Sequence, residues 1–501
     1  MTDRTGVSRG RSTGGEEEAG KGRTSGEQTP SLARNGHDDR SHPAKAGLTR
    51  VEAVNPVEPS AERSGRSAPA GGEAQPAQEQ ELWEKVFSRE NLLRALKRVE
   101  QNEGAPGVDG MTTAELRPWV RRSWPAIRVT LDEGTYRPRE VRRVTIPKPD
   151  GGERELGVPT VLDRLIQQAI AQVLTPIFDP EFSERSFGFR PGRSAHQAVR
   201  TAREDIAEGF EWVVDVDLER FFDRVQHDAL MARVARKVHD RRLLRLIRRY
   251  LEAGIMVEGV KQASVEGTPQ GSSLSPLLSN IMLDDLDREL ERRSHRFARY
   301  ADDLRVHVRS ERAGQRVLTG VSEFIEKRLK LKVNRKKSSV RHAAQATVLG
   351  FGFVLDQDGQ MGIRVDPKAL ERLRRRLRQL TRRSWSIPME ERIERLNRQI
   401  TGWCGYFALA ETPRVFEDLD KWLRRRLRQV RWKEWKLPKA RRRNLRGLGL
   451  PAREAYEWGG SHKGYWRVAG TFLSRALPNK YWADLGLKRF SLRWHQLRSA
   501  W

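Results

Sequence analysis

The 501-residue sequence has a single cysteine, no long apolar run and no Phe, Trp or Tyr in its first 80 positions. Cys404 alone cannot form an internal disulfide, which is typical of a protein in a reducing compartment. The sequence also has no C-x-x-C pair that could hold a structural zinc ion. No stretch approaches the roughly 18 apolar residues of a membrane span, and the first 30 residues lack the apolar core of a signal peptide. We therefore expect a cytoplasmic protein with no membrane partner.

The first 80 residues are poor in apolar side chains. They are rich in Gly, Ser, Pro, Glu and Arg, so they cannot bury enough surface to offset the entropy lost on ordering. Their 11 basic and 12 acidic residues leave this segment nearly neutral. We predict that residues 1–80 form a disordered tail.

Positive charge is concentrated at the other end of the chain. The net charge is +28, and residues 361–501 hold 35 Lys and Arg against 13 Asp and Glu, together with ten of the fourteen tryptophans. Guanidinium groups pair with phosphate, and aromatic rings stack on unpaired bases. A solvated helix face over a Trp-containing core is the alternative for any one run of charge, but the regional excess favours binding of RNA.

The start of this basic region has helical periodicity. The pattern runs from about Leu370 to Lys436 and is interrupted near Pro388 and Pro438, which predicts a helical bundle. Beyond Pro438, glycine and proline become frequent, and we expect an irregular basic extension over residues 438–501.

Two acidic segments stand out in the less basic middle of the chain. In E-W-V-V-D-V-D-L, strand alternation places Asp215 and Asp217 on one face of a largely apolar strand, which is costly unless a cation compensates them. In F-A-R-Y-A-D-D-L-R-V-H-V, Asp302 and Asp303 lie between two apolar stretches, as at a hairpin tip. An isolated Asp-Asp is usually only a turn, but paired with the first strand it indicates a site for two Mg²⁺ ions and phosphoryl transfer.

These segments belong to a series of ordered motifs. Y-A-D-D at 300–303 follows the D-V-D-L-E-R-F-F-D strand and G-T-P-Q-G-S-S-L-S-P at 267–276. P-G-V-D-G, I-P-K-P-D-G-G, S-F-G-F-R-P-G-R-S and V-L-G-F start at residues 106, 146, 186 and 348. Together they resemble a reverse transcriptase, and more narrowly the reverse transcriptase/maturase of bacterial group II introns of the type that lacks an endonuclease.

The resemblance implies an α+β right-hand polymerase with an antiparallel palm sheet, followed by a helical thumb. The corresponding domains are fingers and palm over residues 81–360, a thumb or maturase (X) domain over 361–437 and a basic RNA- or DNA-binding extension over 438–501. L-N-R-Q-I-T-G-W-C-G-Y-F at 396–407 resembles the maturase core signature, although Gly405 stands where the family commonly has Asn. We expect the aromatic residues of this signature to be packing residues.

The resemblance also implies roles in catalysis. The metal ligands would be Asp217, Asp302 and Asp303, with Asp303 serving chiefly the second ion, and Asp217 is preferred to Asp215 because the family places this aspartate five residues before an aromatic. That aromatic, Phe222, would be the gate that rejects a ribose 2′-OH, and its alternative is an ordinary buried ring.

Further residues are implied to bind substrate. Lys148 and Arg154 would contact the incoming triphosphate, and Gln270 and Gly271 the templating pair. The general acid for pyrophosphate would be Lys337, with Lys336 as a close alternative.

Arginines complete the predicted set of contacts with nucleic acid. Arg190 and Arg193, in the loop before a capping box at S-A-H-Q, could contact template phosphate or simply lie on the surface. In the run 421–431 we predict contacts with RNA from Arg424, Arg425 and Arg428.

The implied function is an RNA-directed DNA polymerase that uses deoxynucleoside triphosphates and a DNA primer, binds its host intron RNA for splicing and supports intron mobility. Without an endonuclease, priming would start from an existing DNA 3′ end. Two alternatives remain open: a splicing factor with a vestigial polymerase site, and a reverse transcriptase domesticated by its host. Nothing in the sequence predicts the oligomeric state.

Overall fold

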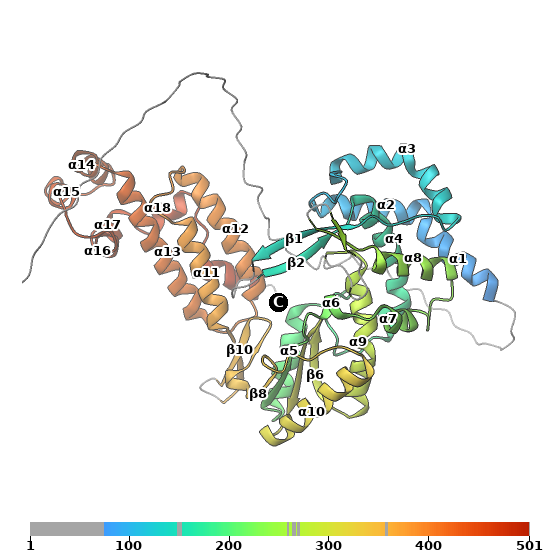
Figure 1. The fold of residues 1–501 in the computed structure, drawn as a ribbon. Coiled ribbons are helices and arrows are strands. Elements are labelled where there is room, and N and C mark those ends of the chain that lie inside the picture. The colour runs from blue at the N-terminus through green and yellow to red at the C-terminus, as the bar shows by residue number, and fades with distance from the viewer. Residues whose placement is uncertain are drawn as a thin grey trace, which may run out of the picture. The chain divides into compact units, whose positions relative to one another are not determined.

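The computed structural model describes residues 75–147, 153–257, 260–262, 267, 271–355 and 359–499 (Figure 1). The predicted disordered tail lies outside the described residues as far as position 74. Helix α1 (Gln75–Phe87) includes the last residues assigned to that tail. The helix thus begins before residue 81, and its Trp83 and Val86 are buried in the main core.

Four helices form the first part of the chain, and their ends follow local capping chemistry. Ser88 caps one helix, accepting from the backbone N–H of Asn91, and Thr112 forms a capping box with Glu115. Thr160 caps another through Asp163 N–H at 3.1 Å. These helices after α1 are α2 (Arg89–Gln101), α3 (Thr113–Asp132) and α4 (Val161–Phe178).

A four-stranded sheet of order β2-β1-β4-β5 accompanies these helices. Its main feature is an antiparallel hairpin in which Arg142 pairs with Val158 and Pro147 with Glu153. The two central strands, β1 and β4, pair in parallel. The four strands are β1 (Val141–Pro147), β2 (Glu153–Val158), β4 (Ile255–Val257) and β5 (Val260–Gln262).

The palm is a second four-stranded sheet, entirely antiparallel, of order β6-β7-β3-β8. Alternation along β3 buries Val214 and Val216 in one core and Val213 in the other, as the sequence pattern predicts. The ladder between β3 and β7 pairs Asp215 with Arg305 and Val216 with Leu304. The four strands are β3 (Trp212–Val216), β6 (Arg296–Tyr300), β7 (Asp303–Val308) and β8 (Ser339–His342).

Helices cover both faces of the palm sheet (Figure 1). On the Val214 face, Gly314 lets one helix approach the side chains of Val214 and Val340. On the other face, a helix begins at the predicted capping box, in which Ser194 and Gln197 bond each other's backbone. The palm helices are α5 (Ala195–Ala207), α6 (Phe221–Arg224), α7 (His227–Val234), α8 (Arg241–Glu252), α9 (Ser275–Arg292) and α10 (Glu311–Arg328), with the short η1 (Asp179–Glu181).

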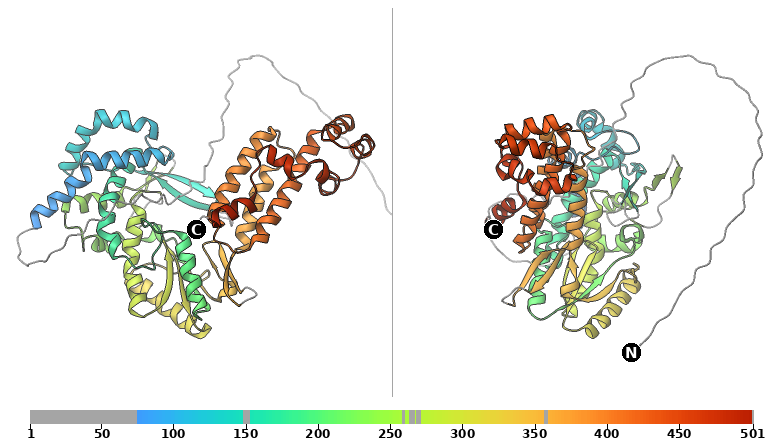
Figure 2. Two further views of the ribbon diagram at one scale, coloured as in Figure 1. Left: turned by 180° about the vertical axis from the view of Figure 1, so that it is seen from behind. Right: turned by 90° about the vertical axis from the view of Figure 1, so that its left-hand side faces the viewer.

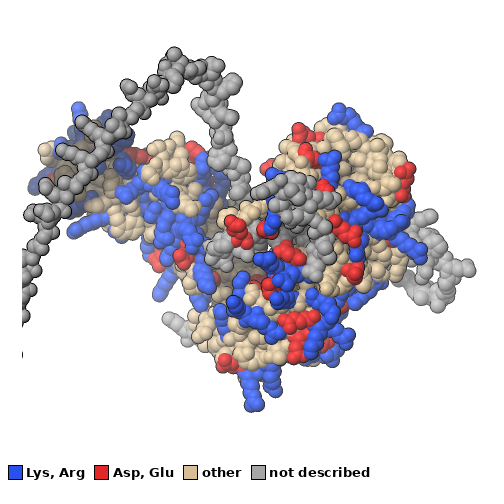
Figure 3. Space-filling view, in the orientation of Figure 1, with Lys and Arg blue, Asp and Glu red and all other residues tan. Residues whose placement is uncertain are grey.

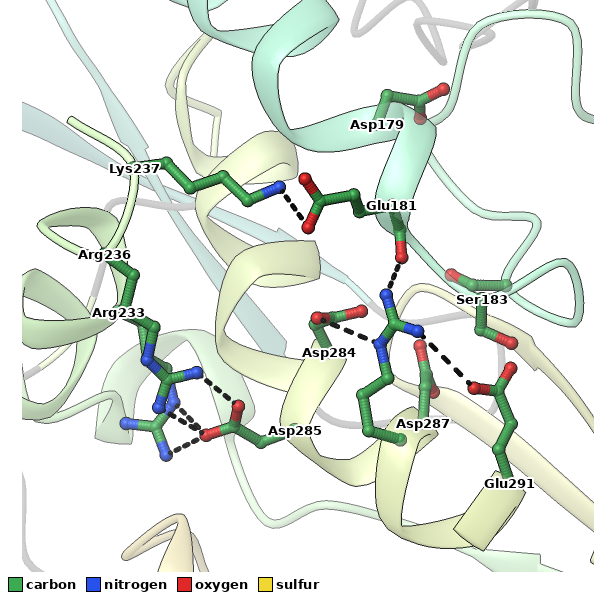
Figure 4. A network of polar contacts seen from close by, with 12 residues as sticks. Asp179, Glu181, Ser183, Arg233, Arg236, Lys237, Asp284, Asp285, Asp287 and Glu291 are labelled. Atoms are coloured by element: carbon green, nitrogen blue, oxygen red, sulfur yellow. Dashed lines mark hydrogen bonds and ion pairs between the residues drawn. The ribbon is translucent and has the colours of Figure 1, made fainter. Parts of the chain in front are cut away.

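Ion pairs tie α9 to α7 (Figure 4). Asp285 accepts from Arg233 Nε at 2.9 Å and from Arg236 Nη1 at 2.6 Å. Burial would raise the pKa of Asp285, but the hydrogen bond from Arg236 and the charges of both guanidinium groups outweigh it and leave the pKa below its ordinary value. This carboxylate therefore stabilises the fold in its charged form.

The neighbouring Asp284 is in the opposite situation. Burial raises its pKa to about 6, because Arg288, with Nε 3.7 Å from the carboxylate, compensates the charge only partly. Arg288 also donates to the backbone carbonyl of Glu181, and the side-chain carboxylate of Glu181 pairs with Lys237 at 2.8 Å. The pKa values of these adjacent aspartates are thus shifted in opposite directions.

A three-stranded sheet of order β11-β10-β9 leads into the C-terminal helices. The predicted helical bundle and both of its breaks are confirmed: Pro388 caps one helix and Pro438 starts another. Its three long helices run side by side in Figures 1 and 2. The elements are η2 (Ala343–Gln345), β9 (Thr347–Val348), β10 (Phe351–Leu355), β11 (Met361–Val365), α11 (Pro367–Leu380), α12 (Met389–Phe407) and α13 (Pro413–Glu434).

The predicted irregular extension after Pro438 is wrong. Most of this segment is helical, because Leu445, Val468, Trp482 and Phe490 are buried in the same core as α12 and α13. Frequent glycine and proline therefore mark the ends of short helices. These are α14 (Pro438–Gly447), α15 (Ala452–Gly459), α16 (Tyr465–Gly470), α17 (Leu473–Ala476), α18 (Asn479–Asp484) and α19 (Phe490–Arg498).

The predicted fold class, α+β with an antiparallel palm sheet followed by a helical region, is confirmed. Within the described part of the chain, no helix is both long and apolar enough to cross a bilayer.

Candidate active site

The predicted aspartates lie at one end of the two central palm strands. Asp217 directly follows β3, whose last ladder pair is Val216 with Leu304, and Asp303 begins β7 one step farther along. Asp302 lies in the turn that joins β6 to β7, just before Asp303. All three side chains are half-buried. We call Asp215, Asp217, Asp302 and Asp303 the acidic edge.

The backbone around Asp217 is held on both sides. Its N–H donates to Ser338 Oγ at 3.0 Å, and its carbonyl accepts from Asn334 N–H at 2.8 Å. The turn between these two partners carries both general-acid candidates, Lys336 and Lys337, with exposed side chains. The backbone thus ties the lysine turn directly to the first aspartate.

The turn that carries Asp302 rests on a buried arginine. Arg299 is fully buried, donates from Nε to Asp287 at 2.7 Å and donates from Nη1 to the carbonyl of Ala301 at 2.8 Å. Ala301 itself adopts a left-handed φ of 59°. Gly188 lies against the backbone of this turn so closely that a Cβ there would collide with Ala301. The S-F-G-F-R motif therefore supports the Y-A-D-D turn.

Arg305 links two members of the acidic edge. Its Nη1 lies 2.8 Å from Asp215 Oδ1 and 2.6 Å from Asp303 Oδ1, and its side chain is 12% exposed. Burial raises the pKa of Asp215, and the nearby charges of Asp303 and Asp217 raise it further, against the opposing charge of Arg305. Asp215, Asp217 and Asp303 therefore act on one another electrostatically.

The donor set of the acidic edge suits a hard divalent cation, because carboxylate oxygens are the ligands that Mg²⁺ prefers. Several carboxylates are close enough there for the charges of Asp303 and Asp217 to act on Asp215, beside the single guanidinium of Arg305. Within the described ranges, no group of three or more His, Cys, Asp and Glu side chains is already arranged to hold one ion. One reason is that the carboxylate of Asp303 is turned toward Arg305, with which it pairs.

The loop after β5 approaches both the fingers and the palm. Gly271, at φ +114°, faces the carbonyl of Gly157 in β2, where a Cβ would lie 3.0 Å from that oxygen. Gly267 N–H donates to the carbonyl of Val225, just after α6, at 2.8 Å. Gln270 lies outside the described residues. Gly271 thus lies against the fingers hairpin and Gly267 against the palm.

Phe222 lies in α6, five residues after Asp217, and is half-buried with its ring edge-on to Phe221 at 5.1 Å. Of the predicted triphosphate contacts, Lys148 lies outside the described residues. Arg154 pairs with Ile146 in the β1–β2 hairpin, and its side chain is not described.

The two loop arginines before α5 have partners within the protein. Arg190 is buried: its Nε donates to Asp179 at 2.8 Å, and its Nη1 donates to the carbonyls of Ser183 and Ser186. Arg193 pairs with Glu184 near the surface. Arg190 is thus placed to hold its own loop together, whereas Arg193 remains close to solvent.

The three arginines of α13 differ in exposure. Arg428 is buried and donates to the carbonyl of Leu477 at 3.1 Å, and burial, with the charges of Arg424 and Arg425, lowers its pKa to about 10. Burial also lowers the pKa of Arg424. Arg425 lies 4.1 Å from the ring centroid of Trp466, which is 42% exposed. Arg425 is therefore the one of the three that lies over an exposed ring, and it also donates to the backbone carbonyl of Trp466 at 3.0 Å.

Tyr406 connects the maturase signature to the palm. Its hydroxyl donates to the carbonyl of Leu349 in the V-L-G-F motif at 2.8 Å, and its own carbonyl lies 2.6 Å from His196 Nε2 in α5. Burial raises its pKa to about 12, with contributions from Tyr300 and Asp303. Trp403 and Phe407 pack on each other at 4.7 Å, as expected for packing residues.

Sequence reasoning missed three residues that support the site: Arg299, Arg305 and Asp287. Arg305 carried a signal, since it is two residues from Asp303 and so shares its face of the strand. Asp287 and Arg299 carried none, because their pairing joins a helix to a strand across the core.

Basic side chains cover the C-terminal helices. Figure 3 shows Lys and Arg spread over this part of the surface with few acidic residues between them, whereas both signs are mixed around the palm. Within the helices, arginines lie over exposed rings, as Arg442 does over Tyr456 at 3.7 Å. Such pairs suit contacts with phosphates and unpaired bases.

Two family descriptions match the chain: reverse transcriptase (RNA-dependent DNA polymerase) over residues 146–353, and group II intron, maturase-specific domain, over residues 370–449. Protein YkfC of Escherichia coli (strain K12) is 32% identical over 303 residues, which cover 52% of this chain and 80% of that protein. The group II intron-encoded protein LtrA of Lactococcus lactis subsp. cremoris is 28% identical over 361 residues, which cover 56% of this chain and 59% of LtrA.

Among solved structures, a chain of a partial Cas6-RT-Cas1–Cas2 complex is 27% identical, with a TM-score of 0.31 over 48% of this chain and 42% of that chain. The reverse transcriptase match takes in the whole acidic edge, and the maturase match begins in α11 and ends just past α14. The chain therefore belongs to the reverse transcriptase family, the RNA-directed DNA polymerases, as a group II intron-type member with a maturase-specific domain.

Proposed function

We propose that this chain copies RNA into DNA by two-metal-ion phosphoryl transfer, binds its host group II intron RNA to assist splicing, and supports mobility by copying that intron. The observation that carries the proposal is the acidic edge. Carboxylates from two adjacent palm strands meet at one end of the sheet in a chain whose net charge is +28. Acidic residues can hold metal ions while the surrounding basic residues hold nucleic acid.

Reverse transcriptases generally use divalent metal ions. We assign Asp217, Asp302 and Asp303 as the residues that hold two Mg²⁺ ions. When bound, such a pair stabilises the attacking and the leaving oxygens of an in-line displacement. Asp215, paired with Arg305, borders this set.

The incoming deoxynucleoside triphosphate would be bound from both sides of the acidic edge. Lys148 and Arg154, on the hairpin of the fingers, would pair with its phosphates, and Phe222 would exclude a ribose 2′-OH. Gln270 and Gly271 would contact the templating pair. The close approach of Gly271 to Gly157 supports this role, because it links the loop to the strand that carries Arg154.

In the transfer itself, the primer 3′-hydroxyl loses its proton as its oxygen bonds to the α-phosphorus, and pyrophosphate leaves. The leaving group requires a proton, for which Lys337 is our candidate donor and Lys336 the alternative. Both side chains are exposed on the turn that is hydrogen-bonded to the backbone of Asp217.

For RNA binding we propose the C-terminal helices, with Arg424 and Arg425 on α13, and Arg193 at the palm as a phosphate contact. Arg190 and Arg428 would act indirectly, because both are buried. We divide the chain into fingers and palm to residue 360, a thumb or maturase domain over 361–437 and an RNA- or DNA-binding segment over 438–501. The last two share one core. The buried thiol of Cys404 fits a cytoplasmic setting.

The proposal is tested by extending a DNA primer on an RNA template with the full-length chain, Mg²⁺ and deoxynucleoside triphosphates. Wild type should extend the primer, and Asp302→Ala should not. A matched control is Asp418→Ala, which removes an exposed carboxylate of α13 and should leave extension unchanged.

Each alternative is separated by one further observation besides primer extension. A wild-type chain that does not extend primers but assists intron splicing would be a splicing factor with a vestigial site. An active polymerase whose coding sequence has no intron RNA structure in its flanking DNA would be a domesticated reverse transcriptase.

A further inference from the structure

Arg305 lies inside the acidic edge, and the proposed function gives it no role. It stands directly opposite Asp215 in the β3–β7 ladder and two residues after Asp303 on the same face of β7. Only 12% of its side chain is exposed, so its charge is held among the carboxylates and is little screened by solvent. A guanidinium remains protonated at any physiological pH.

We infer that Arg305 is a positioning residue: its guanidinium serves as a built-in cation that holds Asp215 and Asp303 together, and it releases Asp303 when a divalent ion binds. The inference rests on the proposed metal-binding role of Asp303. The ion would therefore compete with an internal cation for one of its ligands.

The hydrogen-bond geometry of Arg305 permits this release. An Nη nitrogen carries two N–H groups, yet three oxygens lie within reach of Nη1: Asp303 Oδ1 at 2.6 Å, Asp215 Oδ1 at 2.8 Å and the carbonyl of Leu304 at 3.1 Å. Nε faces the carbonyl of Thr347 at 3.4 Å. If Asp303 turns away, Nη1 keeps its hydrogen bond to the carbonyl of Leu304 and its ion pair with Asp215, whose Oδ1 is near enough to take the freed N–H after a small rotation.

The two carboxylates differ in a way that selects Asp303 as the one released. Asp215 lies inside β3 and is 32% exposed, whereas Asp303 is the first residue of β7, beside the turn, and is 40% exposed. The charges of Asp217 and Asp303 both act on Asp215. Asp215 is therefore the permanent partner that keeps Arg305 in place after Asp303 has moved.

Arg299 shows what a purely structural arginine looks like nearby. Both it and Asp287 are fully buried, and its donors are divided between Asp287, Asn280, Ser186 and the carbonyl of Ala301. No metal-ligand candidate is among these partners. Arg305, by contrast, shares one nitrogen between a candidate ligand and a non-ligand.

The experiment measures Mn²⁺ binding to the full-length protein by electron paramagnetic resonance, and thermal unfolding in chelator and in Mn²⁺. Arg305→Gln should bind Mn²⁺ about tenfold more tightly than wild type, because a competing and repelling charge is gone. It should also melt at a lower temperature in chelator and gain more from Mn²⁺. Arg305→Lys, which keeps the charge, should lie between the two.

Asp215→Asn gives the opposite prediction and does not depend on Arg305→Gln folding. With its other partner neutral, Arg305 is committed to Asp303, so Mn²⁺ should bind several-fold more weakly. The control is Arg296→Gln, which removes an arginine of β6 that pairs with Glu208 at 3.0 Å and should leave Mn²⁺ affinity unchanged.

Equal or weaker Mn²⁺ binding by Arg305→Gln, or unchanged binding by Asp215→Asn, overturns the inference. If wild type extends primers and binds Mn²⁺ while these variants do not differ from it, only the inference fails. If folded wild type neither extends primers nor binds Mn²⁺, the proposed function fails with it.

Discussion

The palm and the C-terminal helices use the same residue, arginine, in different ways. In the palm, Arg299 and Arg305 are enclosed by carboxylates and backbone oxygens, and their charge is compensated inside the protein. In the C-terminal helices, Arg425 and Arg442 lie over exposed rings, at 4.1 and 3.7 Å from the centroids, although Arg425 also donates to the backbone carbonyl of Trp466. The groups around these arginines therefore differ between the two regions: carboxylates dominate in the palm and aromatic rings in the C-terminal helices.

The largest expected effect separates chemistry from RNA binding. Asp217→Asn should reduce primer extension by about 10³-fold or more, because it removes a charge that we propose as a metal ligand at the transferred phosphoryl group. Affinity for intron RNA should be unchanged, since the basic helices are untouched. A filter-binding assay beside primer extension measures both, and a parallel loss of RNA affinity would contradict this division of labour.

The next effect concerns the buried arginine of the palm. Arg299→Met should destabilise the fold by about 3–5 kcal/mol, because Asp287 would be left charged and unpaired in the core. Denaturant unfolding measures this change. The matched variant, Arg299→Met with Asp287→Leu, should recover most of the stability, and if it does not, the pair is more than a buried ion pair.

A smaller effect, on RNA binding, is expected from Arg425, which lies over the ring of Trp466. Arg425→Gln should weaken intron-RNA binding several-fold and lower the slope of log K against log salt by about 1, because it removes one proposed phosphate contact. Its control, Arg312→Gln on an exposed position of α10, should change neither quantity. Equal effects from both variants would mean that only the total charge matters.

The smallest expected effect concerns Asp284 and Asp285 of α9, whose pKa values are shifted in opposite directions. The folded-state pKa of Asp284 is raised to about 6 from 3.8, so the folded state binds this proton more tightly than the unfolded state does. Above pH 6 its charge therefore costs stability, and the cost fades as the pH falls below 6. Asp284→Asn should stabilise the protein by about 1 kcal/mol at pH 7.5, with a smaller gain at pH 5.

Asp285→Asn is the matched control on the same helix. The pKa of Asp285 lies below its ordinary value, so its charged form stabilises the fold at neutral pH. This variant should therefore be less stable than wild type at pH 7.5. Chemical denaturation at the two pH values tests both variants, and a shift of the same sign would be inconsistent with opposite roles.

Much of the fold could be predicted from local patterns. Strand alternation predicted which side chains of β3 face each core, S-A-H-Q predicted the start of α5, and helical periodicity predicted α11 to α13. The segment after Pro438 was mispredicted because its helices are short and are stabilised by burial of side chains such as Leu445 and Trp482 against α12 and α13. Such tertiary packing leaves little periodic signal.

The sequence by itself determined the family, the strands that carry the aspartates and the separation of acidic from basic regions, because motifs, periodicity and charge are local properties of the chain. Only the tertiary structure decided which arginines form ion pairs with aspartates inside the protein. The pairing of Arg305 with Asp215, or of Arg299 with Asp287, depends on strand register and on a helix crossing a sheet. Neither is encoded in the spacing of the residues concerned.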